Sequence, residues 1–185
     1  MKYTKSDLAR IFRALEKKGV TGVIIGDTSV QLYLGASELE GDIDVFVIEP
    51  SPLAYREVYE EVAVENNWEL STSEAGLPAL VVPVREGYVV VEFYENYMDI
   101  EVPLEFFEEA YEYKVDGTII KAVRPEHYLV LKARQGTDLD KLEKYAASLK
   151  QKGLNLKLVE RAASVYPPEE SRIIIERLRS IKLSI

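Results

Sequence analysis

Two apolar segments near the N-terminus flank a short helix that begins just after a glycine. Residues 20–27, "VTGVIIGD", predict a buried strand, and residues 28–36, "TSVQLYLGA", predict a helix capped by Thr28 or Ser29. Residues 42–48, "DIDVFVI", predict a second buried strand. A strand, a helix and a returning strand in so short a segment restrict the chain to a sheet covered by helices.

The chain up to residue 124 alternates between helical and extended patterns, and the rest is helical. The predicted helices of the first part are 6–18, 51–67 beginning at Pro52, and 103–113. Its further predicted strands are 68–74, 79–84, 88–95 and 115–123, with 79–84 and 88–95 as a hairpin. Four more helices are predicted at 125–135, 138–153, 156–165 and 169–181.

These patterns predict an α/β (α+β) fold in two parts. Residues 1–124 form a sheet flanked by helices, and residues 125–185 form a C-terminal helical region packed on that core. No flexible linker separates the two parts.

Composition narrows the functional class. The 185 residues are 47% hydrophobic, which is enough for a packed core, and they include no cysteine. A thiolate metal site or a cysteine nucleophile is therefore excluded. The net charge of −9 argues against general coating of nucleic acid. No apolar run of membrane-spanning length occurs, so we expect a cytoplasmic protein. The many Glu and Lys residues favour a thermophilic source.

Two aspartates mark the start of the second predicted strand. Asp42 and Asp44 point to one face of a strand, while Ile43 and Val45 point to the other, toward the core. Two carboxylates on one face repel each other unless a cation lies between them, and oxygen ligands suit a hard ion such as Mg²⁺. The alternative is that they are solvated charges at a strand edge.

The glycine before the first helix is typical of an anion site. Gly26 would let a ligand approach the backbone, and the free N–H groups of the following helix favour a phosphate. Asp27, Thr28 and Ser29 open that helix and are further candidates for nucleotide binding, with the Thr28 and Ser29 hydroxyls expected to contact the phosphate in addition to capping the helix. An anion site beside a cation site is the layout for a metal-bound nucleoside triphosphate, although Gly26 could also serve only as a turn residue.

A third acidic position is expected on a later strand. Glu92 interrupts the apolar segment "YVVVEFYE", and a charge there is costly to bury without a partner. Asp99 is the rival, and an edge strand that turns Glu92 toward water is the alternative. His127, the only histidine, is expected at the surface of the helix that begins at Pro125.

The segments "IIGDTSVQLYLG" and "EGDIDVFV" resemble the nucleotidyltransferase fold superfamily, the polymerase-beta-like minimal nucleotidyltransferases. Their signature is an apolar strand, a Gly-Gly or Gly-Ser pair, an Asp-x-Asp pair and a later acid. The segment "VDGTIIKAVRPEHYLVLKARQGTDLDKL" is similar to the tail of AbiEii-like and MenA-like members, including archaeal-type ones. The resemblance covers roughly residues 20–145.

This resemblance implies a mixed sheet flanked by helices and Mg²⁺- or Mn²⁺-dependent transfer of a nucleotide from a nucleoside triphosphate to a hydroxyl group. Asp42, Asp44 and Glu92 would be the catalytic metal ligands, with Glu92 also the base. Gly26 and Lys132 would contact the triphosphate; otherwise Lys132 is a surface lysine.

The resemblance also implies an acceptor, which would be a protein side chain or the end of a tRNA or other RNA. A partner toxin or antitoxin protein is also implied. Asp27 departs from the family pattern, in which Gly or Ser usually follows the glycine, because its charge would repel a triphosphate unless it turns away or binds metal. The alternative function is therefore a member that binds nucleotide or a partner protein without transfer.

Overall fold

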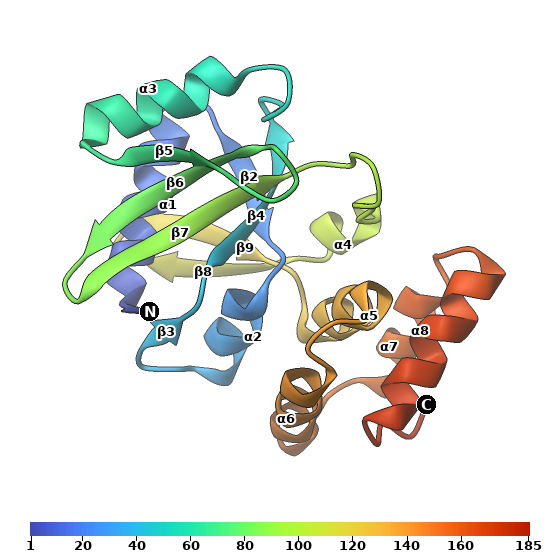
Figure 1. Ribbon diagram of the computed structural model, residues 1–185. Coiled ribbons are helices and arrows are strands. Elements are labelled where there is room, and N and C mark those ends of the chain that lie inside the picture. The colour runs from blue at the N-terminus through green and yellow to red at the C-terminus, as the bar shows by residue number, and fades with distance from the viewer.

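The computed structural model describes residues 1–185 and contains a seven-stranded mixed sheet, a small two-stranded sheet and eight helices (Figure 1). The strands are β1 (Lys2–Tyr3), β2 (Thr21–Ile24), β3 (Leu39–Glu40), β4 (Ile43–Glu49), β5 (Glu69–Thr72), β6 (Pro78–Val84), β7 (Gly87–Tyr94), β8 (Tyr111–Val115) and β9 (Thr118–Ala122). The helices are α1 (Lys5–Lys17), α2 (Asp27–Leu34), α3 (Arg56–Asn66), α4 (Leu104–Glu108), α5 (Pro125–Gln135), α6 (Leu139–Gln151), α7 (Leu156–Ala163) and α8 (Pro168–Ser180).

The large sheet has the strand order β5-β6-β7-β4-β2-β9-β8. β4 pairs with β7 in parallel and with β2 antiparallel, so the strand that carries the Asp-x-Asp pair lies at the centre. β6 and β7 form the predicted hairpin, with Val84 opposite Gly87. This mixed sheet flanked by helices confirms the predicted fold class.

Two hydrophobic cores lie on opposite faces of the sheet. On one face, α1 and α3 cover side chains such as Val45 and Phe93. On the other face, α2, α4 and α5 to α8 pack over Val23, Phe46 and Val123. The alternation along β4 explains the division, because Ile43 and Val45 enter the first core while Asp44 and Phe46 face the second layer.

Helix α2 begins one residue earlier than the sequence predicts. Its N-cap is Gly26, with φ −90° and ψ −164°, so the predicted cap at Thr28 or Ser29 is wrong. Its C-cap is Gly35, which has φ 79° and therefore adopts a conformation that suits glycine. No side chain caps the helix, and the backbone at Gly26 lies close to Asp44 at the start of β4.

Several predicted boundaries also move. Helix α1 starts at Lys5 rather than at residue 6, because Thr4 caps it through a reciprocal capping box with Asp7. Helix α3 starts at Arg56, not at Pro52, because residues 50–55 form a turn region in which Ser51 Oγ accepts from the N–H of Ala54. The helix predicted to reach residue 113 ends at Glu108, and Tyr111–Val115 instead pair with β9.

The chain after Pro125 forms the four predicted helices. Helix α5 contacts α2, α6, α7 and α8, so it connects the sheet layer to the rest of the helical region (Figure 1). None of the eight helices combines the length and the apolar character that crossing a membrane requires.

Candidate active site

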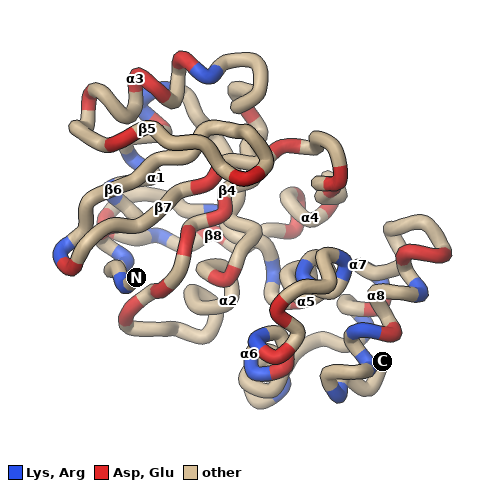
Figure 2. Tube along the Cα trace, viewed as in Figure 1, with Lys and Arg blue, Asp and Glu red and all other residues tan.

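Asp44 and Glu92 lie side by side on neighbouring strands. They are partners in the register of the parallel pair β4 and β7, so their side chains share one face of the sheet. Figure 2 shows acidic segments of these two strands next to each other. The structure therefore brings together two of the three carboxylates predicted from the sequence.

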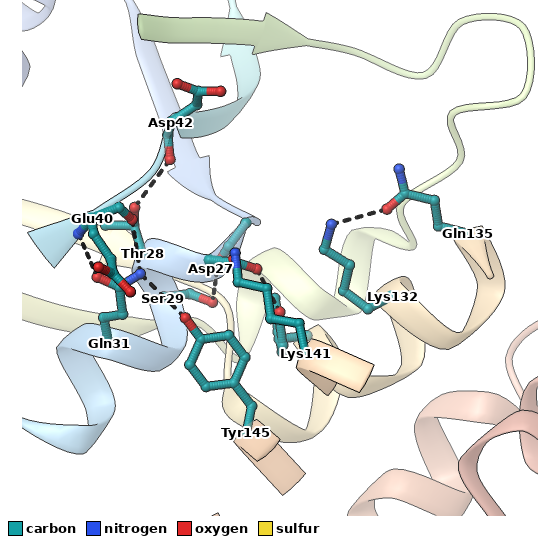
Figure 3. Close-up of polar contacts among 12 residues, drawn as sticks. Asp27, Thr28, Ser29, Gln31, Glu40, Asp42, Lys132, Gln135, Lys141 and Tyr145 are labelled. Carbon is teal, nitrogen blue, oxygen red and sulfur yellow. Dashed lines mark hydrogen bonds and ion pairs between the residues drawn. The ribbon is translucent and has the colours of Figure 1, made fainter. Parts of the chain in front are cut away.

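Asp42 lies just before β4 and is exposed. Its carbonyl oxygen accepts from Thr28 Oγ1 at 3.4 Å, and its carboxylate points away from Thr28 (Figure 3). Gln31 fixes the preceding segment, because its side chain donates to the Glu40 carbonyl oxygen at 2.9 Å and accepts from the Glu40 N–H at 2.8 Å. Helix α2 thus holds the strand entry that carries Asp42.

The pKa of the Asp44 carboxyl is raised to about 6. Burial is the largest cause, and the negative charges of Glu92, Asp27 and Asp42 act in the same direction, while Lys132 opposes them. Asp44 thus lies in a field of carboxylates with one cation. Bringing a further positive charge to this point would stabilise its ionised form.

Gly26 leaves room for Asp44. A Cβ atom at position 26 would lie 1.8 Å from Asp44 Oδ2, well inside any allowed contact. The backbone of residue 26 has ordinary extended dihedral angles, so the glycine is required by this close approach and not by its φ value. The N-terminus of α2 and the Asp44 carboxylate are therefore in direct contact.

A cavity of about 540 Å³ opens beside these groups. Gly26, Asp44 and Tyr94 line its sheet side, and Lys132 lines its α5 side, with Nζ bonded to Gln135 Oε1 at 3.1 Å. Residues 99–102 form another wall. Asp99, the rival third acid, lies in this loop and is exposed, whereas Glu92 is next to Asp44 in the sheet.

Asp27 is engaged by the helical region (Figure 3). Its carboxylate accepts a hydrogen bond from the Tyr128 hydroxyl at 2.5 Å and forms an ion pair with Lys141. Burial opposes the charge of Lys141, but the hydrogen bond to Asp27 and its charge outweigh burial and raise the Lys141 pKa. The negative charge of Asp27, which would repel a triphosphate, is therefore balanced by the Lys141 ammonium group of α6.

The hydroxyl groups of Thr28 and Ser29 face the protein interior. Thr28 Oγ1 lies 2.6 Å from the Tyr3 hydroxyl, and Ser29 Oγ donates to the Gly26 carbonyl oxygen at 2.7 Å. Both residues are fully buried. To contact a phosphate, as predicted, both hydroxyls would have to give up these hydrogen bonds.

No three Asp, Glu or His side chains are gathered closely enough to form a ready metal cage. Glu92 instead accepts a short hydrogen bond from the hydroxyl of Tyr94, two residues along the same face. None of Asp42, Asp44 and Glu92 has a salt-bridge partner.

Sequence reasoning missed Tyr94, Lys141 and Arg134. Arg134, two residues after Lys132 on α5, lines the same cavity and donates to the Asp99 carbonyl oxygen at 2.9 Å. His127 is not at the surface: it is 2% exposed and stacks on Phe106 with 4.1 Å between ring centroids. Burial lowers its pKa to about 4, so this histidine is neutral near pH 7.

Comparison with known proteins finds a family that spans nearly the whole chain. Residues 4–180 match the family described as "Nucleotidyl transferase of unknown function (DUF2204)". None of the curated proteins has a significantly similar sequence.

A solved structure shares the fold, and others are more distantly similar. An antigenic nucleotidyltransferase-like protein from Paracoccidioides brasiliensis superposes with a TM-score of 0.58 at 13% identity, covering 97% of this chain and 90% of that one. The antibiotic-resistance factor ANT(2'')-Ia, solved in solution, has a TM-score of 0.48 at 14% identity, covering 94% and 89% of the two chains. Its crystal structure with adenylyl-2''-tobramycin gives 0.46 at 13% identity, covering 96% and 98%.

Proposed function

Because this chain belongs to the DUF2204 family of nucleotidyl transferases, we propose that it moves a nucleoside monophosphate from a nucleoside triphosphate to a hydroxyl group. The observation that carries the proposal is the adjacency of Asp44 and Glu92 in the register of β4 and β7, beside Gly26 and a cavity of about 540 Å³. Binding of a metal-bound triphosphate requires carboxylates that hold the cation, a backbone that the phosphates can approach closely, and open space.

Asp42, Asp44 and Glu92 would hold a divalent cation, Mg²⁺ or Mn²⁺. The chemistry of the donor set fits such an ion, because it consists of carboxylate oxygens without salt-bridge partners, and a cation would draw together side chains that are not gathered at one point. Burial first, and then the charges of the neighbouring carboxylates, raise the pKa of Asp44, and a bound cation would offset both effects. When bound, the ion would stabilise the negative charge of the triphosphate and of the attacking oxygen.

The remaining residues bind and orient the substrate. Gly26 and the N-terminus of α2 would admit the triphosphate, and Lys132 would contact it from α5. A new bond forms between the acceptor oxygen and the α-phosphorus, the bond from that phosphorus to the bridging oxygen breaks, and pyrophosphate leaves. Glu92 would accept the hydroxyl proton.

The acceptor we propose is a hydroxyl on a protein side chain or at an RNA end. The alternative, a member of the fold that binds nucleotide without transfer, was motivated by Asp27. Its ion pair with Lys141 weakens that motive, since the charge next to Gly26 is balanced within the protein.

Labelled nucleoside triphosphates, incubated with the protein, Mg²⁺ and cell lysate, test the proposal. We expect label in an acceptor for the unaltered protein, loss of that label with a chelator, and at least about a 100-fold lower rate for Glu92→Gln. Glu86→Gln is the matched control and should keep the rate, because Glu86 is exposed in the turn of the same hairpin and lines neither cavity. No labelled product in any fraction would overturn the proposed transfer.

Lys141→Ala tests how Asp27 is neutralised. The substitution leaves the Asp27 carboxylate beside the proposed triphosphate site without its cation. We expect KM for the triphosphate to rise about 10-fold, since a nearby like charge costs on the order of 1 kcal/mol in a partly solvated site. Asp27→Asn in the same background should restore KM, and an unchanged KM in Lys141→Ala would show that Asp27 lies outside the field of the triphosphate.

A further inference from the structure

A second basin lies at the opposite end of α5 from Lys132. Its volume is about 490 Å³, and it is lined by Glu109, Arg124, Asn155, Lys157, Leu158 and Arg161. None of these residues lines the cavity beside Asp44. The basin therefore belongs to a separate part of the surface, between the N-terminal ends of α5 and α7.

Positive charge dominates this basin. Three cationic side chains, Arg124, Lys157 and Arg161, stand against one lining carboxylate, that of Glu109, which gives the lining a formal net charge of +2. The buried carboxylate of Glu126, bonded to the Asn155 N–H, reduces the local excess to +1. Lys157 is exposed and has no ion-pair or hydrogen-bond partner for its ammonium group. The protein as a whole has a net charge of −9, so this positive charge in one hollow is not needed for solubility.

The guanidinium groups are already held in place. Arg161 forms an ion pair with Glu109, and Arg124 Nε donates to the Glu109 carbonyl oxygen at 2.8 Å while its guanidinium covers the Tyr111 ring at 4.8 Å. Each guanidinium has further N–H groups beyond these bonds. Positioned arginines lose less freedom when they bind an anion than mobile ones would.

Backbone dipoles add to the side chains. Arg124 is the N-cap of α5 and Asn155 is the N-cap of α7, so the positive ends of two helices meet at the basin. Glu126, in the first turn of α5, accepts the Asn155 N–H at 2.9 Å and connects the two ends. His127 lies behind Glu109 with its Nε2 3.6 Å from Oε2, and it adds no charge because it is neutral.

The helical region as a whole has the opposite charge balance to the core. Residues 125–185 carry 12 Lys and Arg against 8 Asp and Glu, whereas residues 1–124 carry 11 against 24. Figure 2 shows this division, with Lys and Arg on α5 to α8. An anion is therefore attracted to this side of the molecule and repelled by the acidic core.

We propose that this basin binds a phosphate group with at least two negative charges, such as a terminal phosphate monoester or pyrophosphate. Arg124, Lys157 and Arg161 would supply charged hydrogen-bond donors. The guanidinium N–H groups that are not already bonded can donate to two phosphate oxygens at once. The site is distinct from the proposed triphosphate site, and it does not depend on transfer activity.

Calorimetric titration of the full chain with inorganic pyrophosphate, in chelator and low salt, tests the proposal. We expect saturable binding that weakens about 10-fold in Lys157→Glu, because the substitution reverses one charge of the basin. Lys144→Glu is the matched control: it makes the same change at an exposed position of α6 and should leave the affinity unchanged. Glu109→Gln should tighten binding several-fold, since it removes the negative charge of the only carboxylate that lines the basin.

Two further arms separate the sources of the phosphate. A short RNA with a 5′-phosphate that competes with pyrophosphate, while the same RNA without it does not, would assign the basin to a nucleic-acid end. Competition by neither would assign it to a small phosphorylated ligand. Absence of saturable pyrophosphate binding, or binding lost in Lys132→Gln but kept in Lys157→Glu, would overturn the proposal.

Discussion

Asp44→Asn is expected to abolish nucleotide transfer and, at the same time, to make the metal-free protein more stable. The carboxylate is buried among Glu92, Asp27 and Asp42, and its pKa is raised to about 6, so near pH 7 its charge destabilises the folded state by on the order of 2 kcal/mol. Asparagine keeps the shape and removes the charge.

The activity should fall about 1,000-fold, because a metal ligand next to the proposed base contributes several kcal/mol to the transition state. The melting temperature without divalent ions should rise by a few °C. Thermal unfolding in chelator, set beside the labelled-triphosphate assay, measures both effects. A variant that loses stability and activity together would indicate a structural role for Asp44 instead.

Gly26→Ala is expected to inactivate the protein with little change in its backbone. The methyl group would meet Asp44 Oδ2 at 1.8 Å, so the Asp44 side chain must rotate away from its place beside Glu92. The dihedral angles of residue 26 are open to alanine, and no strain arises from the backbone. We expect transfer to fall at least about 100-fold, as it does when a reacting group is displaced by about an ångström.

The control is Gly41→Ala, near the same strand entry, where a Cβ meets nothing within 4 Å but φ is 89°. That variant should lose some stability because of its left-handed backbone, and it should keep activity in the folded fraction. Unfolding curves and the transfer assay on both variants distinguish the two mechanisms. Retained activity in Gly26→Ala would show that Asp44 works from another rotamer.

The sequence alone could place Asp42 and Asp44 on one face of a strand and Glu92 on a later strand, because the alternation of side chains along a strand is a local rule. Asp42, Asp44 and Glu92 stand at positions that interrupt apolar runs, and the parallel pairing of β4 and β7 then places Asp44 beside Glu92. The hairpin of β6 and β7 and the four C-terminal helices followed from similarly local patterns.

Contacts between distant segments could not be obtained in this way. Lys141 neutralises Asp27 only because α6 packs near α2, and no local pattern relates two residues so far apart. His127 looks like a surface residue of a helix start, yet α4 covers it through Phe106. The cap of α2 was misplaced because hydroxyl residues that usually cap helices are here engaged in the interior.

The strand order has a consequence for how the chain folds. β2 joins β9 at Ile24 and Ala122, which are 98 residues apart, so the β9–β8 side of the sheet cannot join the rest until most of the chain is available. Closing so large a loop costs conformational entropy before any contact repays it, which favours slow folding compared with a helical bundle of this size. During synthesis, the half-sheet of β4 to β7 would gather the carboxylates before the strand that leads into α5 exists. The acidic site is therefore assembled early and receives its cations, Lys132 and Lys141, last.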